Sequence, residues 1–197
     1  MRIVLTSNFP RPGNERLADY LRATCGMSSI AWCAAQPDAV RFADAQAEFS
    51  AYGFDDLRWL SADRASAIYL SGGDPLVFRA ALLRSPLPAQ CAATLVGASG
   101  GAMQLTPNLS LFRLLQHDVS QVLEQRRDHA ALGLVLFEIL PHHDRQTPEL
   151  LAAVCQYSAA IDNDIWCLAD GAAVVQEADG SIGCIGQARC LRGGVFV

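Results

Sequence analysis

Ser99 is the residue whose surroundings most clearly predict covalent chemistry. It lies in the pentapeptide GASGG at residues 97–101, which matches the pattern G-x-S-x-G and directly follows an apolar run. In this pattern the serine occupies a tight strand-to-helix turn that keeps its hydroxyl exposed, and small neighbours are needed because the backbone is crowded. The N–H of Gly100 would then help to stabilise an oxyanion. The pattern arises by chance in roughly one chain of this length in fifteen, so an incidental serine in a glycine-rich turn is the alternative.

A nucleophilic serine needs a base, and the base needs an acid that orients it. Of the four histidines, His142 and His143 follow an expected strand and Pro141. His117 and His129 stand in polar, helical surroundings that are typical of a solvated face. One of the two adjacent histidines is therefore the candidate base, with a pair of loop histidines as the alternative. A metal site at His142, His143 and Asp144 is the weaker alternative, because no further cluster has the spacing of metal ligands.

Asp170 is the candidate acid because it follows the expected strand Ile165–Leu168, at a carboxyl end. The order serine, histidine, aspartate argues against an α/β-hydrolase, in which the acid precedes the histidine. In that order the acid would be Asp118 or Asp128, and neither lies at a convincing strand end. Asp144 is the local competitor, but its place beside the histidines makes a productive hydrogen bond to an imidazole harder. A simple turn role for Asp170 is the alternative.

A second glycine motif precedes Ser99 by one strand. The sequence LSGGD at residues 70–74 is a strand-to-helix turn. Backbone N–H groups that glycine leaves accessible can approach a developing oxyanion at about 2.7–3.1 Å. Gly72 and Gly73 are therefore candidates for oxyanion and substrate binding, with an ordinary loop as the alternative.

The elements expected to hold these residues alternate between strands and helices in the first half of the chain. Short apolar strands are expected over residues 2–7, 29–34, 57–60, 67–70 and 92–96, and helices over 15–24, 38–52 and 76–83. This alternation predicts an α/β fold whose mostly parallel sheet is covered on both faces. Ligands of such sheets bind at the carboxyl ends of the strands.

The second half is less regular. Strands are expected over residues 134–140, 165–168, 172–176 and 182–185, helices over 111–127 and 147–161, and a hairpin turn over 178–180. No strand is assigned beyond Ile185. Since no internal repeat, low-complexity tract or linker interrupts the pattern, residues 1–197 are expected to form a single domain.

Composition excludes several classes of protein. The 197 residues are 51% hydrophobic and 18% charged, which excludes disorder, and the net charge of −5 argues against nucleic-acid binding. The longest apolar run, Ala130–Leu140, contains Glu138 and is about half of the roughly 20 residues that cross a membrane. The apolar stretch after Met1-Arg2 is too short for a signal peptide. Seven cysteines without a Cys-x-x-Cys pair agree with a cytoplasmic protein that has free thiols.

Four segments together resemble a known family. They are IYLSGGDPL at residues 68–76, VGASGGAM at 96–103, LGLVLFEILPHHD at 132–144 and LADGAAVV at 168–175. In this order they are similar to the aspartyl dipeptidase (PepE-type) and cyanophycinase family of serine peptidases. The resemblance runs from about residue 2 to residue 186. It implies a three-layer α/β sandwich of the class I glutamine amidotransferase-like, flavodoxin-related type.

Carried over by position, the resemblance implies Ser99 as nucleophile, His142 as base and Asp170 as acid. It also implies that Gly73 and Gly100 supply oxyanion N–H groups, beside Gly72. Two positions depart from the family pattern. Gly100 stands where the family has alanine, and His143 stands where the family has an aromatic residue after the base.

The function implied is that of a serine dipeptidase or aminopeptidase that needs no cofactor and releases the N-terminal residue of dipeptides or short peptides. The resemblance also implies a homodimer. The alternatives are a non-catalytic binding module of the same fold and an esterase or amidase with the same triad. A glutamine amidotransferase is disfavoured because that chemistry uses cysteine where this chain has Ser99. The aspartate preference of the dipeptidase branch is not carried over, because we match its acid-recognising arginine to no position here.

Overall fold

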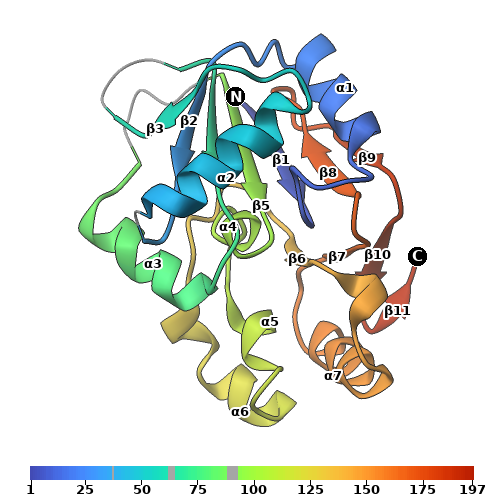
Figure 1. The fold of residues 1–197 in the computed structure, drawn as a ribbon. Helices are drawn as coiled ribbons and strands as arrows, with labels where there is room; N and C mark the ends of the chain where they lie inside the picture. Colours follow the sequence, from blue (N-terminus) through green and yellow to red (C-terminus); the bar gives the residue numbers. More distant parts are fainter. Residues whose placement is uncertain (37, 62–64, 88–92) are drawn as a thin grey trace.

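The computed structural model of the chain describes residues 1–36, 38–61, 65–87 and 93–197. Its main sheet has seven strands in the order β3-β2-β4-β5-β1-β8-β9. The strands are β1 (Arg2–Thr6), β2 (Ile30–Cys33), β3 (Leu57–Trp59), β4 (Ala67–Leu70), β5 (Thr94–Ala98), β8 (Ala173–Gln176) and β9 (Ile182–Ile185). The first five pair with one another in parallel, whereas β8 pairs antiparallel with both β1 and β9 (Figure 1). The prediction of a mostly parallel sheet is confirmed.

Helices cover both faces of this sheet. The helices are α1 (Glu15–Ala23), α2 (Ala39–Ser50), α3 (Pro75–Arg84), α4 (Gly100–Met103), α5 (Ser110–Arg113), α6 (Val119–Glu124) and α7 (Pro148–Ala159), with short 3-10 turns η1 (Arg126–His129) and η2 (His143–Arg145). Side chains alternate along a strand, so Val4 of β1 packs toward α1 and α2 while Ile3 and Leu5 pack toward the remaining helices. Figure 1 shows α1 and α2 in front of the sheet. The layered α/β sandwich is confirmed.

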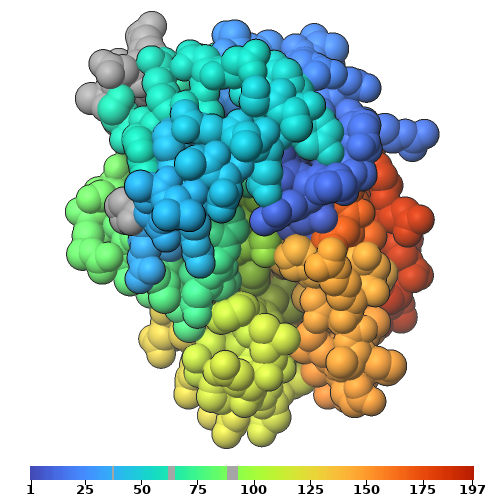
Figure 2. All heavy atoms as spheres, viewed as in Figure 1, coloured from blue at the N-terminus to red at the C-terminus, as the bar shows by residue number. Residues whose placement is uncertain are grey.

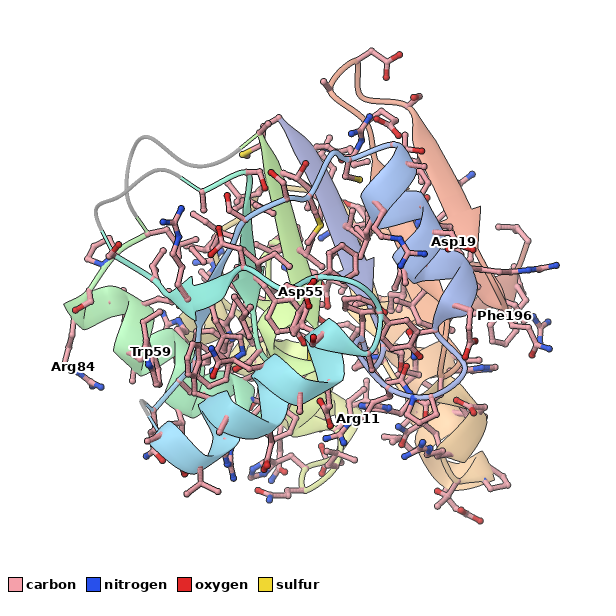
Figure 3. The ribbon with its side chains drawn as sticks, turned by 45° about the horizontal axis from the view of Figure 1, so that its top comes forward. Arg11, Asp19, Asp55, Trp59, Arg84 and Phe196 are labelled. Atoms are coloured by element: carbon pink, nitrogen blue, oxygen red, sulfur yellow. The ribbon has the colours of Figure 1, made fainter. Side chains whose placement is uncertain are left out.

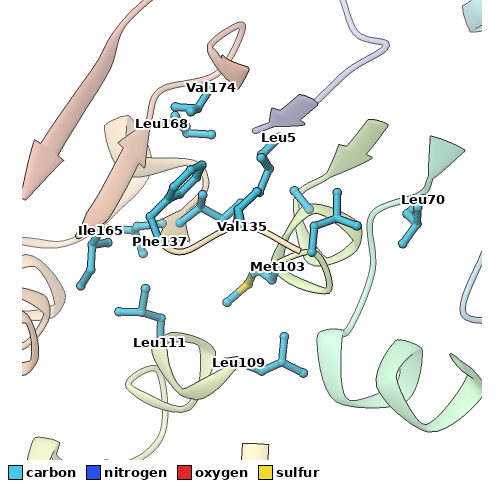
Figure 4. Close-up of a cluster of buried hydrophobic side chains, with 14 of the residues drawn as sticks. Leu5, Leu70, Met103, Leu109, Leu111, Val135, Phe137, Ile165, Leu168 and Val174 are labelled. Atoms are coloured by element: carbon cyan, nitrogen blue, oxygen red, sulfur yellow. The ribbon is translucent and has the colours of Figure 1, made fainter. Parts of the chain in front are cut away.

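A second sheet of four strands lies beside the first and was not predicted as a separate sheet. Its order is β11-β10-β7-β6, and its strands are β6 (Glu138–Leu140), β7 (Ile165–Leu168), β10 (Ala188–Arg192) and β11 (Val195–Phe196). Strands β6 and β7 are parallel. Leu5 and Leu70 of the main sheet share one core with Ile165 and Leu168 of the second sheet and with Met103 of α4 (Figure 4). This shared core fixes the second sheet against the first.

Two predicted elements are corrected. The expected helix over 111–127 is divided into α5, α6 and η1, because the side chain of Asp118 accepts a hydrogen bond from the N–H of Gln121 and starts a new helix. The expected strand over 134–140 is a strand only from Glu138. The N–H groups of Leu134 and Val135 instead donate to the carbonyl of Leu105, so this part pairs with no strand.

Most other element boundaries lie within two residues of the prediction. Strand β5 is displaced by two residues from the prediction, since it begins at Thr94 and ends at Ala98, and residue 92 of the predicted strand lies outside the described residues. The predicted hairpin is present, with Gly180 at φ +87° between β8 and β9. Within the described part of the chain, no helix has the length and hydrophobicity needed to span a bilayer.

Candidate active site

Ser99 lies at the carboxyl end of β5, on the sharp turn into α4. Its backbone has φ 49° and ψ −118°, a conformation that a residue with a side chain rarely adopts. The turn is held from both sides, because the Ser99 N–H donates to the carbonyl of Thr6 at 2.9 Å and the Ser99 carbonyl accepts from Met103 N–H at 3.0 Å. Such strain persists where the surrounding structure enforces it. The predicted strand-to-helix turn is present, and the Ser99 side chain is partly exposed.

The glycines around Ser99 are needed because other backbone segments approach them closely. A Cβ atom on Gly97 would lie 2.6 Å from the Cα of Ala102. One on Gly101 would lie 2.3 Å from the carbonyl oxygen of Leu70. A Cβ atom on Gly100 would lie 2.0 Å from the carbonyl oxygen of Gly73. The last contact leaves no room for an alanine side chain at position 100.

Replacing Gly100 with alanine is therefore expected to displace the 71–74 turn and destabilise the fold. Overpacking of this kind costs about 1–3 kcal/mol of unfolding free energy. Urea denaturation of the wild type and Gly100→Ala measures the loss. Gly183→Ala is the matched control, since nothing lies within 4 Å of a Cβ atom at that position. A Gly100→Ala variant as stable as Gly183→Ala would contradict the close approach.

His142 is placed next to Ser99 by β6 and Pro141. Its Nε2 lies 3.0 Å from Ser99 Oγ, and its Nδ1 lies 2.6 Å from Asp170 Oδ1. Its backbone is left-handed, with φ 56°. His143 points elsewhere, because its ring packs against that of Phe196 with centroids 6.2 Å apart. Figure 3 shows Phe196 at the outer edge of the molecule, well away from Arg11, which lines the cleft beside Ser99. His142 is thus the histidine that faces Ser99.

Asp170 lies where the chain passes from β7 of the second sheet to β8 of the main sheet. Since β6 and β7 are parallel, the residues that follow them, including His142 and Asp170, share one edge. Since β8 pairs with β1, that edge also meets the carboxyl end of β1. The Asp170 N–H donates to Asp144 Oδ1 at 2.9 Å, so Asp144 contacts the backbone of Asp170 and not the imidazole.

Asp170 is held in its ionised form. Burial by itself would raise the pKa of this carboxyl group. Hydrogen bonds from His142 and Ser7 and the charges of His142 and Arg145 outweigh burial, and the pKa of Asp170 lies below its ordinary value. An ionised Asp170 can accept the Nδ1–H of His142 at neutral pH.

Two residues of this arrangement were not identified from the sequence. Ser7 follows β1, is fully buried and contacts both His142 and Asp170. Arg145 lies in η2, and its guanidinium forms an ion pair with Asp170 Oδ2. A polar residue directly after the first strand of a parallel sheet is a usable signal, and Ser7 has it. Arg145 has no such signal, because only the turn of η2 brings it to Asp170.

A cleft of about 970 Å³ opens beside Ser99 and His142. Its walls are the segments after β1, β2 and β4 and one face of α2, and they include Gly72 and Gly73. Charged side chains along it come from Arg11, Arg41, Asp44, Glu48 and Asp74. Figure 2 shows dark-blue, green and orange atoms, which are far apart in the sequence, meeting below α2. The cleft lies at the carboxyl ends of parallel strands of the main sheet, where the sequence places the candidate site.

The other predicted candidates lie away from this cleft. His117 and His129 are not among its lining residues. Asp118 caps α6. Among the residues that the structure describes, no group of three or more histidine, cysteine, aspartate or glutamate side chains is arranged to hold a metal ion.

The fold and the site define a class: an α/β sandwich in which a serine on a strained turn is hydrogen-bonded to a histidine, and that histidine to an aspartate. A crystal structure of a candidate peptidase E protein from Listeria monocytogenes EGD-e is similar, with a TM-score of 0.66 and 16% sequence identity. The match covers 94% of this chain and 98% of that chain. It shows a peptidase E-like fold of the class I glutamine amidotransferase type, as predicted. No protein-family model matches the sequence, and no curated protein sequence matches it.

Proposed function

We propose that this chain is a serine-type dipeptidase or aminopeptidase that hydrolyses the N-terminal peptide bond of dipeptides or short peptides. The observation that carries the proposal is the line of contacts from Ser99 Oγ to His142 Nε2 at 3.0 Å and from His142 Nδ1 to Asp170 Oδ1 at 2.6 Å. These are hydrogen-bond distances suited to a nucleophile, its base and the acid that orients the base. The peptidase E-like fold supports the same proposal.

In the proposed reaction His142 Nε2 accepts the proton of Ser99 Oγ as the oxygen attacks the scissile carbonyl carbon. The imidazolium then gives this proton to the leaving amine as the C–N bond breaks, and the substrate's acyl group remains on Ser99. A water molecule next gives a proton to His142 and attacks the acyl carbon. The proton returns to Ser99 Oγ as the acid is released, so the enzyme is regenerated. Asp170 stays ionised and stabilises the imidazolium throughout.

The N–H groups of Gly73 and Gly100 are the proposed donors to the oxyanion. Gly100 is the first residue of α4, so its N–H has no acceptor within the helix. Gly72 lies against the Ser99 side chain, because a Cβ atom on Gly72 would be 3.5 Å from that of Ser99. The proposed steps use only groups of the protein, the peptide and water. Charges of both signs in the cleft suit a substrate with an ammonium and a carboxylate group.

The remaining inferences from the resemblance stay predictions. These are membership of the aspartyl dipeptidase and cyanophycinase family and a homodimer. The cytoplasmic location and the single domain over residues 1–197, which were inferred from composition and patterning, also stay predictions. Size-exclusion chromatography with light scattering tests the dimer directly.

The test of the proposed function combines covalent labelling with a substrate panel. A fluorophosphonate is expected to add to wild-type protein at Ser99, as mass spectrometry of its peptides would show, and not to Ser99→Ala. Wild type is also expected to hydrolyse at least some of a panel of dipeptides with varied N-terminal residues. Ester turnover without dipeptide turnover would favour the esterase or amidase alternative. Failure of both labelling and hydrolysis would favour a non-catalytic binding module.

A further inference from the structure

The hydroxyl of Ser7 lies at the junction of the histidine and the aspartate. Ser7 Oγ is 2.9 Å from Asp170 Oδ1, 3.2 Å from His142 Nδ1 and 2.8 Å from the backbone nitrogen of His142. The side chain is completely buried. One hydroxyl therefore contacts the acid, the base and the backbone of the base.

The donors and acceptors in this cluster admit one consistent arrangement. The backbone N–H of His142 can only donate, so Ser7 Oγ accepts from it and turns its own proton toward Asp170 Oδ1. Asp170 is ionised and therefore accepts both this proton and one from His142 Nδ1. The imidazole is then protonated on Nδ1, and the bare Nε2 faces Ser99 Oγ. This is the tautomer that can take the serine proton.

The opposite tautomer is disfavoured by the same contacts. Without a proton on Nδ1, its lone pair would face the Asp170 oxygen at 2.6 Å, and two acceptors at that separation repel each other. The one hydroxyl proton nearby belongs to Ser7, whose Oγ lies nearer to the carboxylate oxygen, at 2.9 Å, than to His142 Nδ1, at 3.2 Å. The hydrogen bond from the His142 N–H to Ser7 Oγ also holds the backbone of His142 at φ 56°, a left-handed conformation that is costly for a residue with a side chain.

We propose that Ser7 is a positioning residue that reinforces the Nδ1-protonated tautomer of His142, which Asp170 favours, and holds the imidazole between Asp170 and Ser99. This inference rests on the proposed function only for its effect on hydrolysis, since the tautomer can be observed in an inactive protein. The other neighbours of Asp170 act differently. Arg145 is two-thirds exposed and contacts Oδ2, and Asp144 contacts only the backbone of Asp170.

The test replaces Ser7 with alanine and compares it with a matched control, Thr6→Val. Thr6 is the adjacent residue, is equally buried and donates its hydroxyl to the carbonyl of Ala172 at 3.0 Å. Valine keeps the backbone carbonyl of residue 6, which accepts the Ser99 N–H. We expect Ser7→Ala to lower kcat for peptide hydrolysis about tenfold to a hundredfold, the effect of losing a hydrogen bond to a charged group. We expect KM to change less than threefold and Thr6→Val to keep kcat within threefold of wild type.

A second readout does not depend on activity. Nitrogen-15 NMR spectra of the imidazoles, recorded above pH 8 and assigned with a His142→Gln variant, distinguish the two tautomers of His142. Wild type and Thr6→Val are expected to show His142 protonated on Nδ1, and Ser7→Ala a mixture of tautomers. Carbon-13 spectra of the aspartates should also show the pKa of Asp170 raised in Ser7→Ala, because Ser7 stabilises the ionised form.

The outcomes separate the two proposals. A Ser7→Ala protein with an unchanged tautomer and unchanged kcat would overturn the role of Ser7, and so would an equal loss in Thr6→Val. If no peptide is hydrolysed by wild type but the tautomer changes in Ser7→Ala as expected, the positioning role stands and the peptidase proposal fails.

Discussion

Replacing Ser99 with alanine is expected to lower kcat for peptide hydrolysis by about a millionfold, and replacing Asp170 with asparagine by about ten-thousandfold. The double variant is expected to be no slower than Ser99→Ala alone. Groups that act as one unit are not additive, because removal of the nucleophile leaves nothing for the base and the acid to assist. The residual rate would come from binding and from the oxyanion donors.

The physical reason for the Asp170→Asn effect is again the imidazole tautomer. Asparagine can present an N–H to His142 Nδ1 in place of an oxygen, which favours a proton on Nε2. An imidazole protonated on Nε2 cannot accept the proton of Ser99 Oγ at 3.0 Å. The variant would also lose the ion pair with Arg145.

Steady-state kinetics on the best dipeptide of the panel would measure these changes, with single-turnover assays for the slowest variants. Asp128→Asn is the control, because it removes an exposed carboxylate outside the cleft. It is expected to retain wild-type kinetics. If Asp170→Asn kept more than a tenth of wild-type kcat, Asp170 would not be the orienting acid.

Replacing Arg126 with methionine is expected to cost about 3 kcal/mol of unfolding free energy at pH 7. Glu138 of β6 is completely buried, and its carboxylate accepts a hydrogen bond from Arg126 at 2.7 Å. Arg126 also donates to Tyr157 Oη at 3.0 Å. Without the guanidinium, Glu138 would be a buried charge held mainly by the hydroxyl of Tyr157. Because β6 leads directly to His142, this pair also supports the candidate active site.

The loss of unfolding free energy caused by Arg126→Met should depend on pH. Burial raises the pKa of Glu138 above its ordinary value, although Arg126 and Tyr157 partly oppose the rise. Between its unfolded pKa and its raised folded pKa, the native state therefore binds more protons than the unfolded state, and stability falls as pH rises through that window. Removing Arg126 raises the folded pKa further. The difference between wild type and Arg126→Met should be largest at neutral pH and should shrink as the pH falls toward the unfolded pKa.

Urea denaturation of both proteins between pH 4.5 and pH 8 would measure this difference. Adding Glu138→Gln to Arg126→Met removes the buried charge and is expected to restore most of the stability at pH 7. Arg192→Met is the control, because it breaks an ion pair with Asp164 in which Arg192 is 67% exposed, and such pairs contribute at most about 1 kcal/mol. An Arg126→Met variant with wild-type stability at pH 7 would show that the Arg126–Glu138 ion pair does not stabilise the fold.

The strands of the main sheet and the turn at Ser99 could be predicted because their signals are local. Apolar runs of four or five residues separate amphipathic helices, and the glycines of residues 97–101 are typical of a crowded turn. The strands β10 and β11 could not be predicted in this way. They are short and partly exposed, and they form because the edge of β7 is available to pair with β10.

The contacts around His142 depend on pairing over long distances in the sequence. Ser7 and Asp170 are 163 residues apart, and they meet because β8 pairs with β1 while β7 belongs to another sheet. The expectation that the histidine and aspartate follow strands was sound, but those strands belong to the second sheet. Strand order across a sheet is set by which apolar faces are buried together, and no short pattern records it.

By itself, the sequence determined which residue types were available for chemistry and the strand ends at which they stand. Ser99 on a glycine-rich turn, a histidine after Pro141 and an aspartate before Gly171 follow from local propensity and backbone sterics. Only the tertiary structure decided that His142 and not His143 faces Ser99, and that Ser7 and Arg145 contact Asp170. Such choices depend on hydrogen bonds and packing between distant segments, which exist only once the two sheets share one core.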